Sequence, residues 1–109
     1  MAYDEAYAAV LRDRLAGHAG ITERHMFGGL SFMLNGNMAC GVHGQRVMFR
    51  VGKAQQDAAL LVPGTLPLSF TKRPMGGMVE ADAEILDDPD RLNRLMGLAV
   101  GFAGSLPPK

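Results

Sequence analysis

The chain has 109 residues, of which 48% are apolar and 20% charged, and its eleven basic and eleven acidic residues cancel. This length suits a single domain with one continuous core, and this composition excludes a disordered chain. A net charge of zero removes the electrostatic attraction on which non-specific DNA binding depends, so we expect no direct DNA binding.

The single cysteine, Cys40, excludes an internal disulfide, and the N-terminal residues lack the features of a signal peptide. No apolar run approaches the roughly 18 residues that a membrane-spanning helix needs. We therefore expect one domain over residues 1–109, without a membrane association and located in the cytoplasm.

The N-terminal third predicts a helix and the start of a sheet. Apolar residues from Tyr7 to Leu15 recur at helical spacing, which predicts an amphipathic helix at residues 4–16. Residues 21–27 then lead into Gly28 and Gly29, a pair that suggests a bulge or a sharp bend within a strand.

The centre of the chain predicts a three-stranded meander. Asn35-Gly36 between two apolar runs is the strongest short-range hairpin signal, because both central positions of a type I′ turn need positive φ. It predicts strands at residues 30–34 and 38–42. A second turn around His43-Gly44-Gln45 leads to a third strand at residues 46–51.

The remaining elements complete a two-layer fold. Residues 53–61 predict a short helix, and two short strands follow at residues 66–70 and 77–81. Asp88 is a suitable cap for a final helix that runs to about Gly104, and the acidic run before it suits a solvated turn. The order predicts an α+β fold: an antiparallel sheet of about five strands with helices on one face, α-β-β-β-α-β-β-α.

The expected strand pairs assign residues to the two faces of this sheet. The pairs are Met33 with Met38, Ser31 with Cys40, Val42 with Val47, and Cys40 with Phe49. The face with the helices would then carry Met33, Met38, Cys40, Val42, Val47, Phe49 and Val51. The opposite face would carry Leu30, Phe32, Leu34, Ala39 and Met48 beside Arg46 and Arg50.

Such an opposite face is too apolar to be left in water, so we expect a second copy of the chain to cover it in a homodimer. The competing interpretation is a bulge at Gly28-Gly29 or at Gly41 that turns these residues into the core.

The sequence offers few groups for catalysis or metal binding. His25, Cys40 and His43 have the right chemistry, but Cys40 and His43 point to opposite faces of their strand in the expected register. Neither glycine pair fits a phosphate-binding loop. We therefore predict no enzyme activity, no catalytic residues, no metal and no cofactor. Arg24, Lys72 and Arg73 would form a small anion-binding patch if they gather, although a solvated surface is the simpler interpretation.

Several segments resemble the N-terminal domain of the TfoX (Sxy) family. They are RHMFGGLSFMLNGNM at residues 24–38, MFRVG at residues 48–52, RPMGGMVE at residues 73–80 and FAGSLPPK at residues 102–109, in the family's order. The resemblance implies a two-layer α+β domain of the secretion-chaperone-like type. It also implies a link to transcription regulation, since named members regulate competence genes. Those regulators carry a second, C-terminal domain, and we expect this chain to be a stand-alone copy of the first domain.

The main hypothesis is a non-enzymatic interaction or regulatory module that acts through protein–protein contacts. The expected surface includes Arg24, Phe27, Gly28, Gly29, Leu30, Phe32 and Met48. It is extended by Arg73, Pro74 and Met75. The alternative is a small-molecule or metal-binding protein with activity around His25, Cys40 and His43.

Overall fold

The computed structural model describes residues 3–26, 28–70 and 73–109 and contains a six-stranded antiparallel sheet. The strands are β1 (Ile21–Met26), β2 (Gly29–Leu34), β3 (Asn37–His43), β4 (Arg46–Arg50), β5 (Thr65–Phe70) and β6 (Arg73–Asp82). Their order across the sheet is β1-β2-β3-β4-β6-β5. The helices are α1 (Glu5–Leu15), α2 (Gln56–Leu60) and α3 (Pro89–Ser105), with short 3₁₀ turns at Lys53–Gln55 and Ala83–Asp87.

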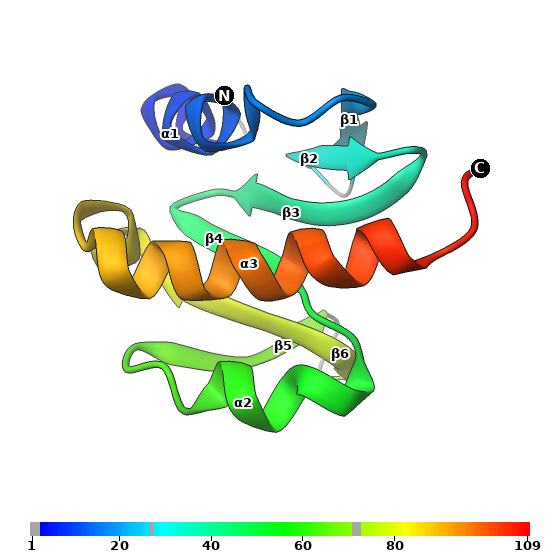
Figure 1. The fold of residues 1–109 in the computed structure, drawn as a ribbon. Helices are drawn as coiled ribbons and strands as arrows, with labels where there is room; N and C mark the ends of the chain where they lie inside the picture. The colour runs from blue at the N-terminus through cyan, green and yellow to red at the C-terminus, as the bar shows by residue number, and fades with distance from the viewer. Residues whose placement is uncertain (1–2, 27, 71–72) are drawn as a thin grey trace.

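The helices form one layer on one face of the sheet, as the sequence predicts. In Figure 1, α3 crosses this face, with α1 on one side of it and α2 on the other. One core cluster joins Leu11 of α1, Ala59 of α2 and Leu95 of α3 to Phe49 and Val79 of the sheet, and all five are fully buried. The apolar stripe of each helix therefore packs against every second side chain of the strands, and together they form a single core.

β1 is a sixth strand that the sequence pattern hides. Between Ile21 and Met26 its residues are polar and exposed, so they show no alternation of apolar and polar side chains. An edge strand needs no such alternation, because only its partner strand and one helix hold it. Glu23 of β1 accepts two hydrogen bonds from Arg12 of α1, at 2.6 Å from Nε and 2.8 Å from Nη2. These bonds to Arg12 lower the pKa of Glu23.

The two predicted turns of the meander are confirmed. Asn35 and Gly36 both have positive φ, 52° and 85°, as a type I′ turn requires. Met33 pairs with Met38 across this turn, and in the next hairpin Val42 pairs with Val47.

The expected pair of Ser31 with Cys40 is wrong, and this error reverses part of the face assignment. Phe32 pairs with Cys40, whereas Met33 pairs with Met38, so Ala39 is an extra residue that forms a β-bulge in β3. A one-residue bulge changes which side chains share a face on its two sides. A bulge is what the competing interpretation proposed, although it expected it at a glycine.

The bulge brings four residues of the supposed outer face into contact with the helices. Leu30 and Phe32 belong to the main core, and Leu34 and Ala39 pack against Ala103 of α3. Met33 and Met38 lie instead on the face opposite the helices, which we call the outer face. Met48 lies there too, as expected, but it is 2% exposed because Leu68 and Met78 pack against it.

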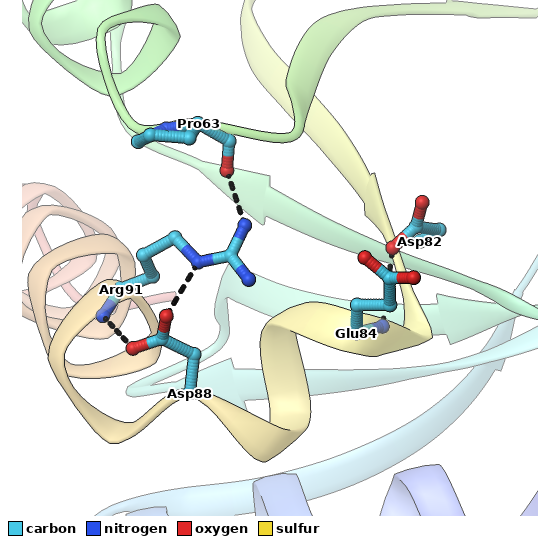
Figure 2. Close-up of polar contacts among 5 residues, drawn as sticks. All are labelled: Pro63, Asp82, Glu84, Asp88 and Arg91. Atoms are coloured by element: carbon cyan, nitrogen blue, oxygen red, sulfur yellow. Dashed lines mark hydrogen bonds and ion pairs between the residues drawn. The ribbon is translucent and has the colours of Figure 1, made fainter.

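The last helix starts at the cap Asp88, and Arg91, which this cap binds, also contacts the loop between α2 and β5. Asp88 accepts hydrogen bonds from the backbone N of Arg91 at 3.2 Å and from Arg91 Nε at 2.8 Å. These bonds lower the pKa of Asp88. Arg91 also donates to the Pro63 carbonyl at 2.8 Å, and Asp82 caps the 3₁₀ turn by accepting from Glu84 N (Figure 2).

Among the described residues, no helix is both long and apolar enough to cross a membrane.

Replacing Phe32 tests the corrected face assignment. Phe32 is fully buried, so Phe32→Ala is expected to lower the free energy of unfolding by about 3–5 kcal/mol. Leu66→Ala is the matched control on β5: Leu66 is 55% exposed, and its loss should change the free energy by about 0.5 kcal/mol. Equilibrium urea unfolding measures both. Equal losses for the two variants would contradict the placement of Phe32 in the core.

Asp88 makes the stability depend on acid pH in a defined direction. Its pKa is lowered from an ordinary value of 3.8, so the stability that its charge contributes is present above that value. This stability is lost as the pH falls through the lower, folded-state pKa. Asp88→Asn keeps an oxygen that can accept the backbone bond and loses the charge, whereas Asp88→Ala loses both.

We expect the urea midpoint at neutral pH to fall from wild type to Asp88→Asn to Asp88→Ala. The gap between wild type and Asp88→Asn should close in the acid range below the ordinary pKa of a carboxyl group. Urea unfolding followed by circular dichroism over this pH range checks both points, and a gap that grows toward acid would refute the assignment.

Candidate functional site

The outer face carries a pocket of about 420 Å³ that crosses the sheet from β1 to β6. Four methionines line it, each from a different strand: Met26 of β1, Met33 of β2, Met38 of β3 and Met78 of β6. Gly36 and Gly76 complete its wall without adding side chains. We call this feature the methionine pocket. Its volume lies within the range of roughly 300–1,000 Å³ that is common for small-ligand sites.

Three cationic residues also line the methionine pocket: Arg24 of β1, Arg50 of β4 and Lys109. No Asp or Glu is among the residues that line it. On the same face, Glu80 pairs with Arg46, with 2.9 Å between Glu80 Oε1 and Arg46 Nη2. The main-chain carboxylate of Lys109 offsets the charge of its own side chain, so Arg24 and Arg50 make the pocket positive although the whole chain has a net charge of zero.

Arg50 and the backbone of Lys109 make defined contacts in the structure. The guanidinium carbon of Arg50 lies 5.2 Å from the centre of the Phe102 ring, a cation–π contact. The backbone N of Lys109 donates to the Asn35 carbonyl at 2.8 Å, and Asn37 Nδ2 donates to the Pro107 carbonyl at 3.0 Å. The C-terminal residues thus lie beside the turn between β2 and β3 (Figure 1). Within the described part of the chain, the ion pairs include neither Arg24, Arg50 nor Lys109.

The structure separates the residues of the expected interaction surface. Arg24 lines the methionine pocket, whereas Leu30 and Phe32 are core residues and Met48 lies beneath Leu68 and Met78. Gly28 is exposed and has a φ of 76°, and it leads into Gly29, the buried first residue of β2.

The rest of that surface involves the start of β6. The backbone of Pro74 pairs with Ser69 of β5, and that of Arg73 pairs with Phe70, while Met75 continues β6. Phe27 lies outside the described residues, and so does Lys72 of the expected anion-binding patch.

Sequence reasoning missed most of the pocket because the bulge moves Met33 and Met38 to the outer face. Arg50 was expected on that face, and it is there. The sequence signal that could have indicated the pocket is composition: eight methionines are many for a chain of this length. Six of them fall in or beside the predicted strands rather than in helices, but only the tertiary structure shows that four meet.

The alternative site at His25, Cys40 and His43 is not assembled. Cys40 is fully buried in the helix-side core, and burial raises the pKa of its thiol to about 12. His25 is exposed on the edge strand, where its ring centre lies 6.0 Å from that of Tyr3. Among residues 3–26, 28–70 and 73–109, no three His, Cys, Asp or Glu side chains come together as metal ligands. This geometry does not favour the metal or nucleophile hypothesis.

The fold and the site together define a class: a small α+β domain whose helices fill one sheet face and whose other face carries an open, positive pocket. The chain belongs to the TfoX N-terminal domain family, whose profile matches residues 13–103. Comparisons with curated proteins and with solved structures gave no significant match. The resemblance expected from the sequence is thus confirmed over most of the chain.

The buried thiol makes a chemical prediction. A thiol with a pKa near 12 and no exposed surface is almost entirely protonated and shielded near neutral pH. Iodoacetamide should therefore leave Cys40 unmodified in the native protein and alkylate it fully in urea, as read by intact mass. Rapid alkylation of the native protein would revive the nucleophile hypothesis.

Proposed function

We propose that this domain is a non-enzymatic interaction module in the control of transcription and that it acts through protein–protein contacts on its outer face. Membership of the TfoX N-terminal domain family supports the regulatory role, because the named members of that family regulate competence genes. The observation that carries the contact surface is the positive, methionine-lined pocket on the face without helices. We also propose that the protein works in the cytoplasm.

The properties of this face suit contact with another protein. Methionine side chains are flexible and polarisable, so they adapt to partners of different shape. Uncompensated arginines at the same place favour an acidic partner surface and orient it during the encounter. Direct DNA contact is not part of the proposal, since the chain has no net positive charge.

A homodimer through the outer face stays a prediction, but its original argument is gone. It depended on Leu30 and Phe32 as exposed apolar side chains, and both are in the core. Met26 and Met38 remain half-buried on the outer face, beside cations that would repel the same cations of a second copy. This arrangement favours a different protein as the partner.

A comparison of transcripts in cells tests the proposal. Deletion of the gene should change the levels of a defined set of transcripts, and the wild-type gene should restore them. The double variant Arg24→Glu/Arg50→Glu should fail to restore them, because it reverses the charge of the pocket. RNA sequencing measures the outcome, with thermal unfolding of the purified variant as the check on folding.

Arg94→Glu is the matched control, since Arg94 is exposed on α3 and does not line the methionine pocket. It should restore the transcripts as the wild type does. Unchanged transcripts after deletion would refute a regulatory role, and full restoration by a folded double variant would refute the use of this surface.

A further inference from the structure

We propose that the methionine pocket binds a small amphipathic carboxylate, with its apolar chain against the thioethers and its carboxylate against Arg24 and Arg50. This is a ligand site beyond the proposed function. The ligand site is tested on the purified protein. It can therefore be refuted while the regulatory role holds, and the regulatory role can be refuted while the ligand site holds.

The methionines supply the apolar half of such a site. Met33 and Met78 are each 7% exposed and form its more deeply buried part, while Met26 and Met38 are half-buried. Unbranched thioether side chains can move to enclose an alkyl chain at small cost. A volume of about 420 Å³ suits a medium-length chain rather than a long lipid tail.

The cations supply the polar half. An arginine can donate two parallel hydrogen bonds to one carboxylate, which is the geometry that guanidinium and carboxylate groups share. Two carboxylates of the sheet are already engaged: Glu80 pairs with Arg46, and Glu23 pairs with Arg12 of α1. An anion entering the pocket would therefore meet positive charge that no lining Asp or Glu offsets.

Other occupants satisfy only one half of the pocket. A soft metal ion such as Cu(I) prefers thioether ligands, but Arg24 and Arg50 would repel it. A simple inorganic anion would leave the methionines without a partner. An amphipathic cation would be repelled as the metal is. The combination of four thioethers and two arginines fits an apolar chain that ends in a negative group.

Methionine methyl signals provide a direct measurement. The protein, labelled with ¹³C at the methionine methyl groups, is titrated with octanoate below its micellar concentration. We expect saturable shifts of Met26, Met33, Met38 and Met78, with each signal assigned by a Met→Leu variant. Met96 is the internal control, because it lies in the helix-side core and should not shift.

Three companion titrations separate the two halves of the site. Octanamide has the same chain without the charge, and its affinity should be at least about tenfold lower than that of octanoate. Acetate has the charge without the chain and should cause no saturable shift. Octanoate added to Arg24→Gln/Arg50→Gln should bind at least about tenfold more weakly, whereas Arg94→Gln should bind as the wild type does.

Equal affinity for octanoate and octanamide would overturn the proposal, as would shifts that do not saturate or that include Met96. Shifts caused by Ag(I), used as a stable substitute for Cu(I), without any response to octanoate would show a metal site and also overturn it. A flat octanoate titration refutes only the ligand site, while unchanged transcripts after gene deletion refute only the regulatory function.

Discussion

The bulge at Ala39 is the local constraint on which the two faces of the sheet depend. With one residue more in β3 than in the matching part of β2, Phe32 faces Cys40 while Met33 faces Met38. Phe32 then enters the core with Phe49, and the two methionines turn outward. Because strand side chains alternate, one unpaired residue is enough to decide which of two apolar sets is buried.

The two faces that result have different chemistry. Phenylalanine, branched aliphatic residues and alanines supply most of the helix-side core, where side chains pack closely. The outer side is filled by methionines from four strands and is bordered by Arg24, Arg50 and Lys109. A shaped core gives the domain its single fold, while a flexible and positively charged outer face leaves it able to bind. Stability and recognition are thus assigned to opposite sides of one sheet.

Burial and strand order separate two of the reactive groups that the sequence singled out, Cys40 and His25. The thiol of Cys40 lies on the helix side, where burial raises its pKa to about 12. His25 is exposed on the edge strand β1, and β2 lies between β1 and the strand of Cys40, so the two side chains do not meet. The groups that the structure does bring together are thioethers and cations, which bind rather than react.

The sequence by itself determined the elements whose signals are local. The type I′ turn at Asn35-Gly36 follows from two positions that need positive φ, and the start of α3 follows from the cap at Asp88. The family could also be recognised from the sequence, because its motifs lie in short continuous segments. Only the tertiary structure decided the place of β1, the bulge at Ala39 and the methionine pocket. Each of these depends on contacts between residues far apart in the chain: an edge strand is held by its neighbours, a bulge exists only relative to a partner strand, and a pocket needs several strands to align.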